Sequence, residues 1–262
     1  MNNKCGFTLI EMLIALVVTM VIMGGAYSVF NSQQRQTTIQ TNVSDAQQNV
    51  RAAMDFLSRD LRMAGYDPNN SGNFGISDIK FRDIDDGDDA AGNSFIRFAW
   101  DKIDDGTGTL DPAETIDYGL VNGVTITPGI TDIYFRLPND TNQRDVLSAN
   151  IIALGLAYAY DDNDDGELDS AGGNIIWAVD ADNDDDWDSL NLATGATAET
   201  GTPIDERTIR AVRIWLLGQS QAPDPKYTDT STYIVGSHII TPNDHFRHRL
   251  LERTVLCRNM GL

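Results

Sequence analysis

The longest apolar run of the chain lies near its amino terminus. Residues 7–30 contain one charged side chain, that of Glu11. As a helix rising about 1.5 Å per residue, this run would cover roughly 36 Å, which is enough to cross a bilayer core of about 30 Å. It is longer than the ~7–15 apolar residues of a secretory signal, and no A-x-A pattern closes it. The pattern therefore predicts a membrane-spanning helix over residues 7–30.

A second helical pattern follows directly. Apolar residues recur at spacings of three and four, which is typical of an amphipathic helix with one face on a core. These positions are Ile39, Val43, Ala46, Val50, Met54, Leu57, Leu61 and Ala64. No proline occurs before Pro68. Gly65 and Pro68 are residue types that commonly follow the last turn of a helix. One continuous helix is therefore predicted from about Phe7 to Ala64, with its amphipathic half over residues 31–65.

Beyond Pro68 the pattern changes to short apolar or alternating runs broken by Gly, Asn and Asp, which predicts antiparallel strands. The candidates are residues 95–100, 115–120, 130–137, 151–160, 174–179, 208–217, 233–235 and 250–258. One helix followed by many strands is an α+β order, with a β-rich head over residues 66–262. In the 208–217 strand, Arg210 and Val212 would lie on the face opposite Ala211 and Trp215. The pattern does not decide which face packs on the helix.

The charge of the chain is strongly negative. It has 33 Asp and 6 Glu against 19 Lys and Arg, and its formal net charge is −20. Such a surface repels phosphate backbones, so nucleic-acid binding is excluded as a function. The excess of Asp over Glu favours turns, caps and metal-binding loops over helix surfaces.

The amino-terminal residues carry a specific motif. The leader MNNKCG ends at Gly6, and the chain continues as Phe7-Thr8-Leu9-Ile10-Glu11. This segment resembles the cleavage and methylation signature of type IV prepilins and of type II secretion pseudopilins. The resemblance implies that a prepilin peptidase cuts between Gly6 and Phe7, removes the leader 1–6 and leaves Phe7 to be N-methylated. Lys4 would hold the leader in the cytoplasm, so the head would face the periplasm.

Glu11 is an ionisable residue within the apolar run. Such residues are costly in a membrane and are usually functional, with a partner. The resemblance implies that this partner is the amino terminus of a neighbouring subunit, which would make Glu11 an assembly residue. The alternative is a tolerated acid near the membrane interface, either protonated or snorkelling.

The carboxyl-terminal third carries further motifs. Residues 209–216 read IRAVRIWL, Pro223-Asp224 and Tyr227-Thr228-Asp229 follow, and the chain ends in RNMGL. This arrangement resembles the PilW-type minor pilins. The resemblance implies a type IV pilin fold, in which a long N-terminal transmembrane and amphipathic helix packs on an antiparallel β-sheet head.

The same resemblance implies a function. The chain would be a minor pilin that enters the inner membrane, primes pilus assembly with other minor pilins and the major pilin, and sits in the tip complex at the cell surface. A GspJ-like pseudopilin of a type II secretion system, with the same amino-terminal signature, is the closest alternative.

The acidic residues are concentrated. Between residues 145 and 206 there are 16 acidic side chains and no Lys or Arg, so no cation within the segment is available for local pairing. Residues 161–169 read DDNDDGELD, the spacing of the front half of an EF-hand calcium loop. The candidate ligands are Asp161, Asn163, Asp165, Glu167 and Asp169. Position 12 is Gly172, so the bidentate Glu is absent and weak calcium binding is predicted.

A second acidic run lies over residues 180–188 and repeats the alternation without the glycine. Its candidate ligands are Asp180, Asp182, Asp184, Asp186 and Asp188. For both runs the alternative is a solvated acidic turn. If calcium binds, a further functional alternative is a tip adhesin whose acidic loops, over residues 161–188, bind a surface through the ion.

The remaining reactive side chains do not form a recognisable catalytic set. His245 and His248 are three residues apart, but Cys257 is the nearest further ligand, so a structural role is predicted for both histidines. Cys257 lies in a predicted strand and is expected to be a buried small residue. No phosphate loop or serine-nucleophile motif is present in the sequence, so enzymatic activity is not predicted.

Overall fold

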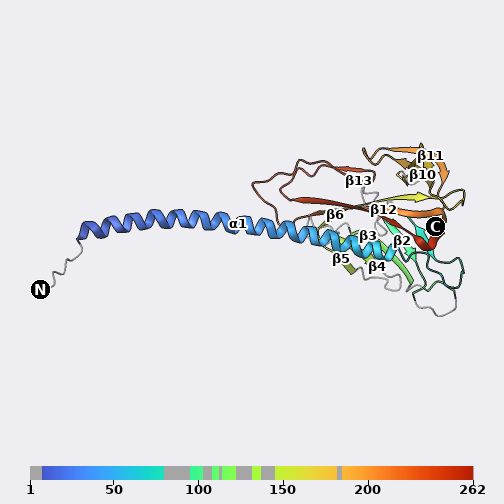
Figure 1. The fold of residues 1–262 in the computed structure, drawn as a ribbon, viewed down its shortest axis with the longest axis horizontal. Helices are drawn as coiled ribbons and strands as arrows, with labels where there is room; N and C mark the ends of the chain where they lie inside the picture. The colour runs from blue at the N-terminus through green and yellow to red at the C-terminus, as the bar shows by residue number, and fades with distance from the viewer. Residues whose placement is uncertain are drawn as a thin grey trace. The chain divides into compact units, whose positions relative to one another are not determined.

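The computed structural model describes residues 8–79, 95–102, 108–111, 114–121, 132–136, 145–181 and 185–261 (Figure 1). Its elements in chain order are α1 Leu9–Leu61, β1 Gly75–Asp78, β2 Ile96–Ala99, β3 Thr115–Val121, β4 Asp132–Arg136, β5 Asp145–Ser148, β6 Ile151–Tyr160, β7 Ser170–Ala171, β8 Asn174–Ile175, β9 Ala178–Val179, β10 Asp186–Leu190, β11 Thr197–Pro203, the 3₁₀ helix η2 Glu206–Thr208, β12 Ile209–Gln219, β13 Tyr233–Val235, β14 His238–Ile240, β15 His248–Leu256 and the 3₁₀ helix η3 Arg258–Met260. The prediction of an α+β fold with an antiparallel head is confirmed.

The chain divides into two compact units, Met1–Ser44 and Asp45–Leu262. In the first unit, α1 carries the apolar run, and large side chains such as those of Leu9 and Val21 are exposed. The helix is long and apolar enough to cross a membrane by length and composition, with none of its most apolar window buried. This agrees with the membrane-spanning segment predicted over residues 7–30.

The second unit contains the carboxyl-terminal part of α1. Val50, Met54, Leu57 and Leu61 are all buried, which confirms the amphipathic stripe in this part of the helix. The helix ends at Leu61, three residues before the predicted end. The amides of Met63 and Ala64 bond three residues back, to Asp60 and Leu61, and tighten the chain into a turn.

Gly65 completes this turn with a left-handed φ of 77°. A Cβ at this position would lie 2.7 Å from the Met260 side chain and 3.1 Å from the Asn259 carbonyl oxygen. The site therefore requires glycine for two reasons, its backbone conformation and the close approach of the carboxyl-terminal residues. The two ends of the head are packed against each other here.

The head contains two larger sheets among the described residues. A five-stranded sheet has the order β1-β2-β3-β4-β5, and a six-stranded sheet has the order β11-β10-β9-β6-β12-β15. Two hairpins, β7-β8 and β13-β14, form separate two-stranded sheets. Side chains of α1, of the five-stranded sheet (Phe98, Tyr118) and of the six-stranded sheet (Leu154, Val212) form one hydrophobic cluster. Helix and sheets thus share a core, and the Tyr118 hydroxyl donates to the Asp60 carboxylate at 2.6 Å.

β12 is central to the packing of the head. Val212, Ile214 and Leu216 join the cluster that contains α1. Ala211 and Trp215 lie in a second cluster, together with Val235 of β13. The structure thereby decides which face of this strand packs on the helix side, a question that the alternation left open.

The strand predictions were wrong at several places. The run 174–179 is two strands, because β8 pairs with β7 in a hairpin whereas β9 pairs with β6 and β10. The strands β1, β5, β7, β10, β11 and β14 were not predicted. β10 and β11 are held by pairing with each other despite residues such as Asp188 and Gly201, so their conformation depends on a neighbour. Residues 130, 131 and 137 of another predicted strand lie outside the described residues.

Candidate functional site

The amino terminus of α1 is closed by a reciprocal cap. The main-chain amide and the hydroxyl of Thr8 both donate to Oε2 of Glu11 at 2.9 Å, and the Glu11 amide donates to the Thr8 hydroxyl at 3.3 Å. This is a capping box, which satisfies amides that a helix leaves unbonded in its first turn. The signal was present in the sequence as the spacing T-x-x-E, but the prediction considered Glu11 only as an assembly residue or as a tolerated acid near the membrane interface. Gly6 and Phe7, the predicted processing residues, lie outside the described residues.

The cap leaves half of the Glu11 carboxylate open. Both bonds from Thr8 end on Oε2, and no described residue donates to Oε1. The same side chain can therefore hold its own helix start and still accept a bond from another molecule. Its role in assembly stays a prediction.

The first acidic loop, residues 161–169, joins β6 to the β7-β8 hairpin. Asp161 is 1% exposed. Its two oxygens accept the amides of Asp165 and Gly166 at 3.1 and 3.0 Å. Asn163 also accepts the Asp165 amide, at 3.0 Å, and Asp165 accepts the Glu167 amide at 2.9 Å. The side chains at the first, third and fifth positions of this loop thus bond to the loop's own backbone, as in a succession of Asx turns.

The end of this loop folds back on its start. The Asp169 amide donates to the Tyr160 carbonyl at 2.9 Å, and the Asp162 amide donates to the Asp169 carboxylate at 3.2 Å. Gly166 has a φ of 82°, as the predicted sharp turn requires. Gly172, the twelfth position of the motif, lies in the turn between β7 and β8.

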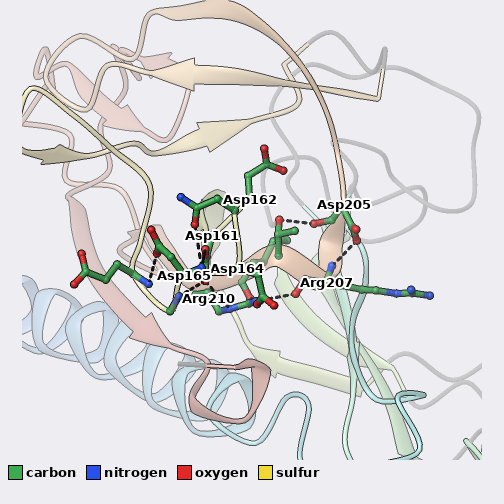
Figure 2. Close-up of polar contacts among 12 residues, drawn as sticks. Asp161, Asp162, Asp164, Asp165, Asp205, Arg207 and Arg210 are labelled. Carbon is green, nitrogen blue, oxygen red and sulfur yellow. Dashed lines mark hydrogen bonds and ion pairs between the residues drawn. The ribbon is translucent and has the colours of Figure 1, made fainter.

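A cation reaches this loop from β12, as Figure 2 shows. Nε of Arg210 lies 3.9 Å from Oδ2 of Asp161, and one of its terminal nitrogens lies 3.5 Å from Asp164. The side chain of Arg210 is 7% exposed and also donates to the Arg207 carbonyl. The acidic segment contains no cation of its own, so its partner comes from another part of the chain. Arg210 lies outside the acidic segment in sequence, and the antiparallel pairing of β12 with β6 places it at the loop.

Two further features position Arg210. Asp205 accepts the Arg207 amide at 3.0 Å and caps η2, which sets the chain just before β12 (Figure 2). Gly261 covers the guanidinium, since a Cβ on this glycine would lie 3.3 Å from Nε of Arg210. The arginine is therefore enclosed by an acidic loop, a 3₁₀ helix and the carboxyl terminus.

The second acidic run is less loop-like than predicted. Asp186 and Asp188 belong to β10, and Asp182 and Asp184 lie outside the described residues. Asp180 and Asp188 are both buried, and Asp188 accepts the Ala181 amide at 2.8 Å. The structure brings these two carboxylates to the start of one short connection between β9 and β10.

No group of three or more His, Cys, Asp and Glu side chains that could hold a metal ion is found in the described part of the chain. In the first loop, Asp161, Asp165 and Asp169 accept backbone amides, and Asp161 also faces Arg210. A cation would have to compete with both partners. Calcium binding, and with it a calcium-dependent adhesin, stays a prediction that a direct measurement must test.

A buried polar cluster holds the segment that follows β12. Asp229 accepts bonds from the Ser231 amide and the Tyr233 hydroxyl, and its Oδ2 lies 2.9 Å from Nδ1 of His248. Nε2 of His248 lies 3.6 Å from Asp244, and the His248 side chain is fully buried. Burial by itself would raise the pKa of Asp229, but these bonds lower it well below its usual value. The cluster fixes the β13-β14 arm to the start of β15.

The other reactive residues predicted to be structural have local partners. Nδ1 of His245 contacts the Tyr227 carbonyl oxygen. Cys257 is buried, and burial raises the pKa of its thiol to about 12. A thiol in this state is not activated as a nucleophile.

Comparison with known proteins is specific at both ends of the chain. Residues 1–27 match the prokaryotic N-terminal methylation motif, residues 39–132 match prepilin peptidase-dependent protein B, and residues 117–259 match type IV pilus-assembly protein W. The chain belongs to the PilW family. The solved structure of the type IV-like pilin TTHA1219 from Thermus thermophilus is similar over 82% of this chain and 97% of its own, with 14% sequence identity and a TM-score of 0.42. No curated protein sequence matches the chain.

The part that matches PilW, residues 117–259, begins within β3 and ends within η3. It includes Arg210, the acidic loop at residues 161–169 and η2, but not Gly261. The matched families are pilins, which are structural proteins rather than enzymes. The methylation motif and the exposed apolar helix of this PilW-family chain together indicate a membrane-anchored subunit of a pilus system that a prepilin peptidase processes.

Proposed function

We propose that this chain is a minor pilin that primes the assembly of a type IV pilus and then remains in the tip complex. The observation that carries the proposal is the match of most of the head to type IV pilus-assembly protein W, in a chain that also has the N-terminal methylation motif.

The exposed helix supports an assembly role. From Leu9 to Phe30 its large apolar side chains are more than half exposed. Apolar surface left in water costs about 25 cal/mol per Å², so this part of α1 requires a cover. The bilayer provides it before assembly, with the head in the periplasm, and the apolar helices of other minor pilins and the major pilin provide it afterwards.

Glu11 would act at the transfer from the membrane to the filament. A cut after Gly6 creates a new amino group at Phe7, four residues before Glu11. The open oxygen of Glu11 can accept such an amino group from a neighbouring subunit. An unpaired charge in an apolar environment is costly. The register between adjacent helices that pairs Glu11 with the amino group is therefore favoured over the others.

The first test is processing. The intact mass of the protein is measured from wild-type cells and from cells that lack the prepilin peptidase. We expect the mature chain to lack residues 1–6 and to carry one methyl group on Phe7 in the wild type alone. A chain that keeps Met1 to Gly6 in both strains would refute the pilin route.

The second test separates the charge of Glu11 from its cap. Glu11→Gln keeps a capping-box side chain but removes the charge, whereas Thr8→Ala removes the cap and keeps the charge. In a deletion strain complemented with each variant, we expect Thr8→Ala to restore surface pili and Glu11→Gln to be processed without restoring them. Normal piliation with Glu11→Gln would refute the docking role.

The deletion strain also distinguishes the alternative system. If the chain is a GspJ-like pseudopilin, its deletion leaves pili intact and abolishes secretion of periplasmic substrates. Loss of pili with normal secretion supports the minor pilin.

A further inference from the structure

The two edges of the six-stranded sheet are built differently. β11 is seven residues long, its pairing with β10 is broken by a register shift, and it ends at Pro203. Bulges and prolines are devices that protect an edge from pairing with another chain. β15 is nine residues long, and its register with β12 is unbroken from His248 to Leu256. No described strand pairs with its other side.

The phase of the β15 ladder is set by the bonds at its two ends. The Cys257 amide donates to the Arg210 carbonyl at 2.8 Å, and the Ser220 amide donates to the Arg247 carbonyl at 3.0 Å. In an antiparallel pair, alternate residues bond to the partner strand and the residues between them point away. Odd-numbered residues of β15 therefore bond to β12, and even-numbered ones turn their N–H and C=O groups outward.

After His248, the first residue of the strand, the outward groups belong to Leu250, Glu252, Thr254 and Leu256. No hydrogen bond joins their main-chain atoms to another described residue. The side chains of Glu252, Thr254 and Leu256 are exposed, that of Leu256 by 47%. The edge thus presents four amides and four carbonyls at the spacing that an added strand requires.

This edge is basic in an acidic protein. Arg249 and Arg253 lie on one face of β15, and Arg258 follows the strand. Arg249 and Arg258 are exposed and form no ion pair with a described residue. The one acidic residue of the strand, Glu252, is already paired with Arg213 at 3.3 Å. The uncompensated charge along the edge is therefore positive.

We propose that the open edge of β15 accepts an extended, acidic segment of a neighbouring pilus subunit as an added strand. Main-chain bonds to the four outward residues hold the segment, and its carboxylates meet Arg249 and Arg258. The opposite charges select an acidic partner and set its register. This inference rests on the proposed function, because it identifies the kind of partner that the subunit meets in the filament.

The test uses the full-length chain in detergent micelles and a synthetic nine-residue peptide of alternating Glu and Val. Amide hydrogen exchange is followed at the four outward residues. We expect at least a tenfold slowing at these amides with the Glu peptide. No slowing is expected with the same peptide carrying Lys in place of Glu, or with one N-methylated along its bonding edge. Unchanged exchange at millimolar Glu peptide, or equal slowing by the Lys peptide, would overturn the proposal.

Two variants test the site itself. Arg249→Glu is expected to weaken binding of the Glu peptide at least tenfold, while Arg51→Glu, an equal charge change at an exposed position of α1, leaves it unaltered. Thr254→Pro removes one outward amide and no bond to β12, and is expected to abolish binding at an unchanged Tm. If Arg249→Glu and Arg51→Glu weaken binding of the Glu peptide equally, the proposal that the β15 edge binds it is overturned. Failure of the minor-pilin proposal would appear in processing and piliation, which this assay does not involve.

Discussion

Replacement of Arg210 by Met is expected to destabilise the head strongly. The side chain of Arg210 is 7% exposed and that of its partner Asp161 is fully buried. Removal of one partner of a buried ion pair costs ~3–5 kcal/mol, because the other charge remains without compensation. Met fills much of the same volume, so the loss reflects charge and hydrogen bonding more than packing.

The magnitude falls at the lower end of that range. Asp161 keeps two backbone amides as donors after the change. The contact with Asp164 contributes little, since that carboxylate is 90% exposed and surface pairs are worth ~0–1 kcal/mol. We therefore expect a loss of about 3 kcal/mol, or a Tm lower by roughly 6–12 °C for a domain of this size.

Tryptophan fluorescence during denaturation provides the assay. All four tryptophans, Trp100, Trp177, Trp187 and Trp215, belong to the second unit, so the signal reports the head of the full-length chain in detergent. Arg51→Met is the matched control, because Arg51 is exposed and such changes stay within about 0.5 kcal/mol.

A double variant separates charge from shape. Arg210→Met together with Asp161→Asn removes the uncompensated carboxylate, so we expect it to be more stable than the sum of the two single losses implies. Strict additivity, or a midpoint for Arg210→Met equal to that of Arg51→Met, would refute the argument that this ion pair holds the loop.

Calcium at millimolar concentration is expected to raise the Tm of the full-length chain relative to chelator, since an ion that binds the folded loop at residues 161–169 stabilises it; identical melting curves would refute calcium binding. Gly155→Ala is expected to cost about 1–3 kcal/mol, because a Cβ there would lie 2.7 Å from the backbone of Val235; an unchanged denaturation midpoint would contradict this. The lowered pKa of Asp229 means that its stabilisation is present above the unfolded value of about 3.9 and is lost as the pH falls through the folded value. Asp229→Asn is therefore expected to reduce the fall in stability below about pH 4, and an identical acid slope would show that another carboxylate is responsible.

Local pattern was sufficient for the helix and for the amino-terminal signature. An apolar run of this length has few alternatives to a membrane helix, and the spacing of Val50, Met54, Leu57 and Leu61 defines a buried face from within one helix. The motifs at both ends also indicated the family that the comparisons then showed. Each of these features depends on residues that are close in sequence.

The tertiary structure decided the features that depend on pairing between distant segments. The acidic loop alone predicted a metal site, but the pairing of β12 with β6 brings Arg210 to Asp161 across 49 positions of chain. Polar strands such as β10 and β11 form because they pair with each other, which local alternation does not encode. The open edge of β15 likewise exists because of the strand order in the sheet. The sequence by itself therefore determined the candidate membrane helix, the helical core face and the family. The partners of buried charges and the free edges of sheets were set by long-range contacts.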